Sequence, residues 1–417
     1  MPLKVALDQD PQLMAILRKE LKRQRFKLEM IASENFVSEA TLRVGASVFT
    51  NKYSEGYPEN RYYGGCENCD ELETLCQTRA RKLFGCEHVN VQPHCGSSAN
   101  MAAFFSVLRV GDTILGMRLD HGGHLTHGAP VSFSGRLFKT EFYGVREDTE
   151  IIDYEGLLAK AEATRPKLII AGGSSYPRTI DFQKFREVAD RVKAYLMVDM
   201  AHFAGLVAAG LFPSPVPLAD IVTTTTHKTL RGPRGGMILC RKTLAKAVDE
   251  QIFPGIQGGP LMHIVAAKAA ALGEALEPEF IDYQRQILKN SQRLATHLTD
   301  AGFRLVSGGT DTHLLLLDLR GVNLTGQAAE TALDKAGITA NKNVVPFDRQ
   351  NYCVTSGLRL GTAALTTRGL VEKDMDRVAE FIVDALRHHQ DESFLNKIRL
   401  RVEEFTQGFP LYPNLEF

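Results

Sequence analysis

Hydrophobic positions from about residue 71 onward follow two alternating spacings, one typical of helices and one typical of strands. The first helical pattern is expected to end near Gly85. Its apolar positions are Leu72, Leu75, Cys76, Ala80, Leu83 and Phe84. Apolar runs of strand length follow, several of them separated by a helical pattern: HVNVQ, DTILGM, KLIIAG, YLMVDM, DIVTTTT and GGMILC. This alternation predicts an α/β domain with a mostly parallel sheet covered by helices on both faces.

The pattern changes after Ala271, where a long helical stretch runs through Gln284 and Leu294. The segments FRLVSGG and HLLLLDL and two late helices follow, and together they predict a smaller α+β domain. One late helix, near 375–386, is amphipathic and is expected to pack on the sheet of that domain. Its apolar positions are Met375, Val378, Ile382 and Leu386.

The first 25 or so residues predict a further helix with an apolar stripe on one face. The stripe consists of Leu13, Ile16, Leu17 and Leu21. Because this stripe has no local partner, we expect it to dock on another subunit. We therefore divide the chain into an N-terminal helical arm at 1–25, a large domain at 26–275 and a small C-terminal domain at 276–417.

Composition agrees with a globular protein of two domains. A chain of 417 residues exceeds one ordinary domain, and 44% hydrophobic with 24% charged residues is typical of globular proteins. Lys plus Arg and Asp plus Glu both number 49, and no dense basic block attracts nucleic acid or acidic lipid. Without an apolar leader or a run approaching ~18 apolar residues, we expect a cytoplasmic protein with no membrane partner.

The seven cysteines show no disulfide-framework spacing, so reduced thiols are expected. Cys66 and Cys69 form a CxxC, but no second pair or histidine pair follows at zinc-ligand spacing. A structural zinc and a redox pair are both disfavoured. His121, His124 and His127 also match no standard zinc signature, and we expect no metal there.

The run HCGSSAN at 94–100 follows a predicted strand and opens a predicted helix. Its small residues would leave backbone N–H groups and hydroxyls free at a positive helix N-terminus, which suits a phosphate. Glycine and serine are also common as ordinary caps and turns, and the motif alone favours that plainer interpretation.

Two more strand ends carry candidate chemistry. VDMAH ends a strand with Asp199, which could hold a ring nitrogen protonated or simply cap the next helix. TTTTHKT brings His227 and Lys228 to the end of the following strand, where desolvation would make the lysine a usable nucleophile. A solvated lysine is the alternative. The phosphate turn, the acidic strand end and the strand-end lysine together predict a pyridoxal phosphate site.

Further motifs, in this order and spacing, closely resemble the serine hydroxymethyltransferase family, and the resemblance runs almost end to end. They are IASENF, TNKYSEGYPENRYYGG, NVQPHCGSSAN, LDHGGHLTHG, SSYPR, VDMAHFAGLVAAG, TTTTHKTLRGPRGG, FPGIQGGPLMH, VSGGTD, NKNVVP and VTSGLRLGT. The resemblance implies a fold-type I pyridoxal phosphate-dependent transferase, with a seven-stranded, mostly parallel sheet in the large domain. It also implies a glycine hydroxymethyltransferase reaction with serine and tetrahydrofolate as substrates.

Residue roles follow from that resemblance, position by position. Lys228 would form the Schiff base and Asp199 would pair with the pyridinium nitrogen, with Thr225 and His227 as further catalytic candidates. The other implied cofactor contacts are Gly96, Ser97 and Ser98 at the phosphate, and His124, Ser174 and His202 at the ring. Arg359 would grip the substrate carboxylate, with Ser33 nearby.

The resemblance implies that a partner subunit completes each site, so we expect a homodimer, with a tetramer as the open alternative. Tyr53, Gly258 and Gly259 would come from the partner. Glu55 would handle protons at the substrate hydroxyl and at the folate. The remaining substrate contacts implied are Tyr62, Tyr63, Leu119, Gly123, His124, Leu125 and Asn343.

The sequence departs from the family pattern at a few places. Cys95 and Ser98 replace a usual serine and a frequent glutamine beside the phosphate, and we expect altered packing or affinity there. Asp120 and the loop 349–353 differ near the expected folate path, and Arg231 stands where a small residue is common. A folate-independent threonine or allo-threonine aldolase, a 2-methylserine hydroxymethyltransferase and a non-catalytic relative remain the alternatives.

Overall fold

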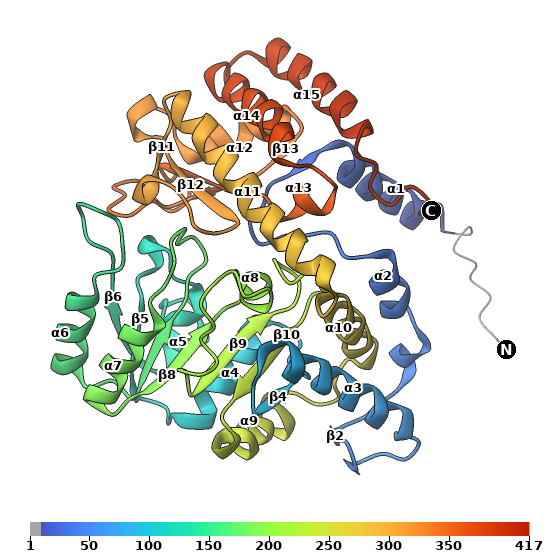
Figure 1. The fold of residues 1–417 in the computed structure, drawn as a ribbon, viewed down its shortest axis with the longest axis vertical. Helices are drawn as coiled ribbons and strands as arrows, with labels where there is room; N and C mark the ends of the chain where they lie inside the picture. The colour runs from blue at the N-terminus through green and yellow to red at the C-terminus, as the bar shows by residue number, and fades with distance from the viewer. Residues whose placement is uncertain (1–9, 417) are drawn as a thin grey trace.

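The computed structural model describes residues 10–416. Figure 1 shows a large sheet flanked by helices, with a second group of helices and a smaller sheet stacked above it. The long helix α11 (Pro278–Asp300) runs obliquely between the two parts.

The large sheet has seven strands in the order β4-β10-β9-β8-β7-β5-β6. Only β10 is antiparallel to its neighbours, which confirms the predicted mostly parallel sheet. The strands are β4 (His88–Asn90), β5 (Thr113–Met117), β6 (Lys139–Tyr143), β7 (Leu168–Ala171), β8 (Tyr195–Asp199), β9 (Ile221–Thr225) and β10 (Gly236–Cys240). The sequence predicted all of them except β6.

Helices cover both faces of this sheet, because alternate strand residues enter two different apolar cores. In β7, Leu168 and Ile170 pack in one core, whereas Ile169 and Ala171 pack in the other. The helices around the sheet are α3 (Glu67–Phe84), α4 (Gly96–Val107), α5 (Phe133–Leu137), α6 (Tyr154–Thr164), α7 (Phe182–Val192), α8 (Ala204–Ala208), α9 (Ala245–Glu250) and α10 (Met262–Ala275).

Helix α3 ends where the sequence predicted, at Gly85, whose φ of 66° closes the helix in the left-handed region. Its buried face is largely the predicted one, since Cys76, Ala80 and Phe84 lie in the core and Leu72 and Leu83 pack against it. Leu75 is the exception at 44% exposed, and Glu73, which the apolar spacing did not include, is fully buried.

The C-terminal part contains an antiparallel sheet in the order β11-β12-β15-β14. Its strands are β11 (Arg304–Leu305), β12 (Leu314–Asp318), β14 (Asn341–Asn343) and β15 (Gly357–Gly361). Its further helices are α12 (Gly326–Lys335), α13 (Ala363–Thr367), α14 (Glu372–Arg387) and α15 (Glu392–Gln407). The four predicted apolar positions of α14 are all buried in this part's core, so that prediction is confirmed.

Two details refine the expected organisation. The stretch expected as one long helix is two, because α10 ends at Ala275 and Pro278 begins α11. Strand β1 (Leu28–Glu29) pairs in parallel with β13 (Ile338–Thr339), and Leu28 and Met30 are buried in the C-terminal core. Residues 28–30 therefore pack with the C-terminal elements, and the proposed domain division at 26 and 275 stays a proposal.

The N-terminal helix α1 (Pro11–Phe26) is capped by Asp10 and lies along α15. Residues 1–9 of the expected arm lie outside the described residues. Met14 is buried, whereas Leu13 and Ile16 of the predicted stripe are exposed, and docking on another subunit stays a prediction. Between α1 and α3 lie α2 (Glu39–Gly45) and the hairpin of β2 (Gly56–Tyr57) and β3 (Asn60–Arg61).

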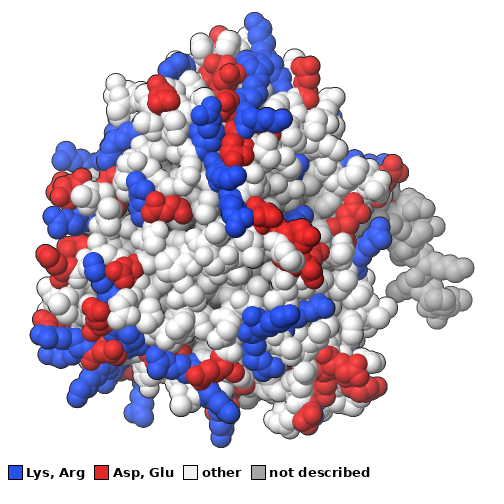
Figure 2. All heavy atoms as spheres, in the orientation of Figure 1, with Lys and Arg blue, Asp and Glu red and all other residues white. Residues whose placement is uncertain are grey.

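On the face shown in Figure 2, acidic and basic side chains are intermixed, as the balanced formal charge leads one to expect. Within residues 10–416, every helix is too short or too polar to cross a bilayer.

Candidate active site

A cavity of about 440 Å³ lies at the carboxyl ends of β8 and β9, and Arg359 from the C-terminal part also lines it. Parallel strands end together at one sheet edge, so the polar residues that follow them meet there. The lining comprises Ser33, Glu34, Cys95, Gly96, Ser97, Asn100, His124, His127, Gly173, Ser174, Asp199, Ala201, His202, Thr225, His227, Lys228, Arg234 and Arg359.

Lys228 is 8% exposed and lines this cavity three residues beyond the end of β9. Its backbone is fixed, since its carbonyl accepts hydrogen bonds from Asn35 Nδ2 (2.8 Å) and from the Arg231 amide (3.0 Å). Burial lowers the pKa of Lys228 to about 8; the Asp199 carboxylate opposes this shift, and the Arg359 and Arg234 charges add to it. The lowered pKa makes the neutral, nucleophilic amine far more accessible near neutral pH than it is for an ordinary lysine.

Asp199 ends β8 and is held by three donors. Its Oδ2 accepts from Asn100 Nδ2 (2.9 Å) and from His127 Nε2 (3.1 Å), and its Oδ1 accepts from the Ala201 amide (3.1 Å). Burial alone would raise the pKa of Asp199, but the His127 hydrogen bond and nearby positive charges hold it well below the ordinary value. The group is therefore a buried carboxylate facing the same cavity as the lysine.

The predicted phosphate turn is present at the N-terminus of α4. Gly96 and Ser97 line the cavity, and no larger residue fits at Gly96, where a Cβ would lie 2.7 Å from Thr225 Cγ2. Ser98 behaves differently from the expectation for its side chain: its hydroxyl donates to the Cys95 carbonyl (2.9 Å) and accepts from the Cys95 amide (3.1 Å). The Ser98 hydroxyl thus caps the helix and lies outside the lining.

Three buried polar atoms of lining residues have no hydrogen-bond partner within residues 10–416: His202 Nδ1, Thr225 Oγ1 and His227 Nδ1. Buried polar atoms normally have partners, so three such atoms around one cavity indicate a polar ligand. Burial lowers the pKa of His124 to about 4 and that of His227 to about 3, and burial puts the pKa of His202 well below its ordinary value. The imidazoles are neutral at neutral pH. Together with a buried amine, a carboxylate and a helix N-terminus, this donor set fits pyridoxal phosphate.

Arg359 reaches the cavity from β15. Its Nη1 donates to the Ser174 carbonyl (2.6 Å) and its Nε donates to Asn341 Oδ1 (3.2 Å), which fixes the plane of the guanidinium. Within the described residues no carboxylate forms an ion pair with it. Burial lowers the pKa of Arg359 to about 10, so it remains a cation and can pair with a substrate carboxylate.

Of the three histidines His121, His124 and His127, the first lies apart from the other two. His121 Nδ1 accepts from the Val145 amide (3.0 Å), and its ring lies against Phe347, away from the cavity. His124, His127 and Asp199 do offer ligand atoms within 4.8 Å of one another. These atoms are already hydrogen-bonded, however, through His127 to Asp199 and through His124 to Thr126 (2.7 Å). The hydrogen bonds account for the cluster, and the expectation of no metal stays a prediction.

A second cavity of about 440 Å³ adjoins the first and shares His124 and Ser174 with it. Its lining includes the residues that the family resemblance assigned as folate contacts from the same chain: Leu119, Gly123, Leu125 and Asn343. Lys342 and Tyr352 complete part of its wall. The loop 349–353, which departs from the family pattern, therefore contributes directly to this cavity.

Besides Ser98, six predicted site residues lie outside both cavities of their own chain: Tyr53, Glu55, Tyr62, Tyr63, Gly258 and Gly259. These six form one cluster, in which the three tyrosines are exposed. Tyr53 hydrogen-bonds Glu55, which raises the pKa of the Tyr53 phenol, and a Cβ at Gly258 would lie 3.0 Å from Glu55 Oε1. Tyr62 is 72% exposed.

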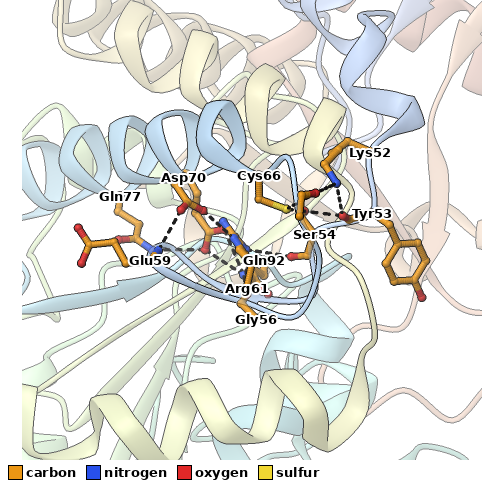
Figure 3. Close-up of polar contacts among 12 residues, drawn as sticks. Lys52, Tyr53, Ser54, Gly56, Glu59, Arg61, Cys66, Asp70, Gln77 and Gln92 are labelled. Carbon is orange, nitrogen blue, oxygen red and sulfur yellow. Dashed lines mark hydrogen bonds and ion pairs between the residues drawn. The ribbon is translucent and has the colours of Figure 1, made fainter.

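A buried ionic network anchors the loop that carries this cluster (Figure 3). Arg61 donates to Asp70 (2.8 Å), to Glu73 (2.7 Å) and to the carbonyls of Ser54 and Gly56, and Gln92 Nε2 also donates to Glu73 (2.9 Å). The Tyr53 side chain extends away from the network in this view. The hydrogen bonds of Arg61 thus hold the loop in place, while the predicted site residues Tyr53, Tyr62 and Tyr63 on it are exposed.

Sequence reasoning missed several lining residues, chiefly Glu34, Asn100, His127 and Arg234. Each stands inside a motif that drew attention for another residue. Asn100 lies one helical turn beyond Gly96, and His127 lies three residues beyond His124, so helical spacing and the glycine-rich turn were the signals that could have identified them.

Comparison with protein-family models gives a match to the model described as serine hydroxymethyltransferase, over residues 6–382. This span covers both sheets, both cavities and the Tyr53 cluster, and it ends within α14. The seven-stranded sheet and its strand-end cavity agree with the fold-type I architecture of that family. The chain therefore belongs to the serine hydroxymethyltransferase family of pyridoxal phosphate-dependent transferases.

Proposed function

We propose that this protein is a serine hydroxymethyltransferase that reversibly converts L-serine and tetrahydrofolate to glycine and 5,10-methylenetetrahydrofolate. The observation that carries the proposal is the pair of adjoining cavities that share His124 and Ser174. One cavity has the amine, the carboxylate and the arginine that an amino-acid substrate and pyridoxal phosphate require. The other offers space beside it for a second substrate, which a simple aldolase does not need.

In the first cavity, Lys228 would hold the cofactor covalently, and Asp199 would pair with its ring nitrogen. Gly96 and Ser97 would bind the phosphate at the α4 N-terminus. Further polar partners for the cofactor are available in the same cavity, namely Thr225 Oγ1, His202 Nδ1 and His227 Nδ1. His124 would stack on the ring. When bound, pyridoxal phosphate supplies an electron sink for the bond that breaks at the amino-acid α-carbon.

The chain's own residues orient the substrate and manage its protons. Arg359, fixed by Ser174 and Asn341, would pair with the serine carboxylate, with Ser33 beside it. Asp199 stays ionised because three donors hold it, and so keeps the ring nitrogen protonated. The neutral imidazoles of His202 and His227 can exchange hydrogen bonds without adding positive charge.

The exposed cluster supports a homodimer with shared sites. Glu55 would reach the substrate hydroxyl and the folate of a partner's cavity, with Tyr53, Tyr62, Tyr63, Gly258 and Gly259 around it. Exposed aromatic side chains on a rigid loop are typical of an interface, and the Arg61 network supplies the rigidity.

The test is serine cleavage by the holoenzyme with and without tetrahydrofolate. We expect glycine formation to depend strongly on folate. Asn343→Ala should raise the KM for tetrahydrofolate while leaving the cleavage of allo-threonine unchanged, since Asn343 lines only the second cavity. A rate indifferent to folate would favour the aldolase, and preferred turnover of 2-methylserine would favour that variant of the reaction. Absence of any visible absorbance with added cofactor would point to a non-catalytic protein.

A further inference from the structure

Lys268 of α10 is a lysine that the proposed reaction does not use. It is 1% exposed, and its Nζ donates to three backbone carbonyls, those of Val91 (2.7 Å), Gly236 (2.8 Å) and Pro93 (3.0 Å). Three acceptors match the three N–H bonds of an ammonium group, whereas a neutral amine has only two. Within residues 10–416, no carboxylate lies at ion-pair distance from it. Lys268 is therefore a buried cation held by carbonyl oxygens.

Two of the three carbonyls that hold Lys268 lie just before the phosphate turn. Val91 and Pro93 lead from β4 into the turn at 94–97, and the amide of Gly236, the first residue of β10, donates to the Pro93 carbonyl (3.1 Å). The packing is close: a Cβ at Gly236 would lie 2.5 Å from the Cys95 carbonyl oxygen, and a Cβ at Gly235 would lie 2.5 Å from Lys268 Cε. The ammonium thus holds the backbone that leads into the turn, and Lys268 is not among the residues that line the cavity.

A buried cation without an anionic partner is costly, and a nearby anion offsets that cost. The turn that follows Pro93 lines the cavity at the N-terminus of α4. The backbone amides of a helix N-terminus favour an anion by themselves. Low surrounding polarity strengthens the attraction between a buried cation and an anion bound across the turn. The carbonyl contacts also fix the direction in which the amides of the turn point, because they hold the backbone that leads into it.

We propose that Lys268 is a positioning residue for the phosphate of the cofactor. It holds the backbone of residues 91–96 in the shape that aims the turn's amides at the phosphate, and its charge adds to their attraction for the dianion. This inference rests on the proposed function, because pyridoxal phosphate is the ligand that brings the phosphate to the turn.

The experiment compares pyridoxal phosphate with pyridoxal, which has the same ring and aldehyde but no phosphate. The holoenzyme is dialysed free of cofactor and titrated with each compound, and binding is read from the visible absorbance of the bond to Lys228. In Lys268→Met, the dissociation constant for pyridoxal phosphate should rise at least about tenfold, while that for pyridoxal changes less than about twofold. Lys268→Gln keeps a donor but removes the charge, and should show an intermediate loss.

Val265→Ala is the matched control, since Val265 is buried in the same helix and packs in an apolar core. It should lower the melting temperature without changing either affinity. Equal weakening of both compounds in Lys268→Met and Lys268→Gln would show a general structural role and overturn the inference, as would unchanged affinity for pyridoxal phosphate. If Lys268→Met does not fold, the Gln variant decides. If the unmodified protein binds neither compound, the proposed function fails instead.

Discussion

Lys228 and Asp199 are both buried, and burial alone would neutralise both. The structure moves the lysine part of the way, to a pKa of about 8, because its side-chain amine has no hydrogen-bond partner within the described residues; it prevents the change at the aspartate, which has three donors. One cavity therefore holds a reactive amine and a stable anion side by side. This pairing of opposite protonation behaviour is typical of functional sites.

The Lys228 environment predicts how cofactor attachment depends on pH. Burial lowers the pKa of Lys228 from an ordinary 10.5 to about 8, so the amine is protonated and unreactive below that pH and neutral above it. The rate of covalent attachment to pyridoxal phosphate should rise with pH through a midpoint near 8. Stopped-flow absorbance measures it, and a midpoint near 10 would mean that the amine is solvated. Lys228→Ala should show no such absorbance at any pH.

Arg359→Lys tests substrate recognition. A lysine keeps the charge but loses the planar fork that Ser174 and Asn341 hold in place, so the KM for serine should rise about tenfold while cofactor absorbance stays unchanged. Steady-state kinetics of the holoenzyme measure this. Arg293→Lys, on an exposed pair with Asp376, is the control and should have no effect. An unaltered KM would indicate that the substrate carboxylate pairs instead with Arg234, the other arginine of the cavity.

Single residues could be predicted where a motif gave them a chemical reason. Lys228, Asp199 and Arg359 were found in this way, and the structure places all three in one cavity. Ser98 was assigned to the phosphate by the family resemblance, yet its hydroxyl caps α4. Its use as a cap depends on the local turn, which composition does not reveal.

At the scale of elements, strand prediction succeeded where both faces of a strand are buried. Strands β7 and β9 are buried at every position and read as continuous apolar or β-branched runs. Strand β6, with the sequence KTEFY, lies at the sheet edge and is buried only at Tyr143, so its pattern was too polar to identify. The parallel pairing of β1 with β13 could not be predicted either, because a strand of two residues is too short to show a periodic pattern of apolar positions.

The contact between α4 and β9 can be tested directly. Gly96→Ala would place a methyl group 2.7 Å from Thr225 Cγ2, so α4 or the strand end must move, and cofactor affinity should fall about tenfold or more. Thr225→Ser removes the obstructing methyl and keeps the hydroxyl. The double variant should therefore recover most of the lost affinity, as measured by absorbance titration. Failure of the double variant to recover would mean that Gly96 is needed for its backbone freedom rather than for space.

At the scale of the whole molecule, the chain carries a strand-end cavity and, outside the lining of that cavity, a separate cluster of predicted site residues. The cavity lies where the strand ends of the large sheet meet Arg359 from the C-terminal sheet. The cluster around Tyr53 and Glu55 lies outside this cavity, on the loop that the Arg61 hydrogen bonds hold in place. A symmetric pair of chains would satisfy both features at once.

Subunit mixing tests this arrangement. Lys228→Ala and Glu55→Gln chains should each be inactive, but hybrid dimers would contain one site built from an intact lysine and an intact glutamate. Dissociated and reassociated in equal amounts, the mixture should recover about a quarter of the activity of the unmodified enzyme. Mixing Lys228→Ala with Asp199→Ala provides the control, because both residues line the same cavity and no hybrid site is complete. Recovery in the control, or none in the first mixture, would contradict shared sites.

The pairing of β1 with β13 also sets an order of assembly during synthesis. Residues 28 and 29 are synthesised long before their partners at 338 and 339. The segment that carries Ser33 and Asn35 therefore cannot form this pairing while the seven-stranded sheet, whose last strand in chain order is β10, is being completed. The nascent chain can acquire its sheet core before Arg359, from the C-terminal sheet, reaches the cavity that holds Lys228.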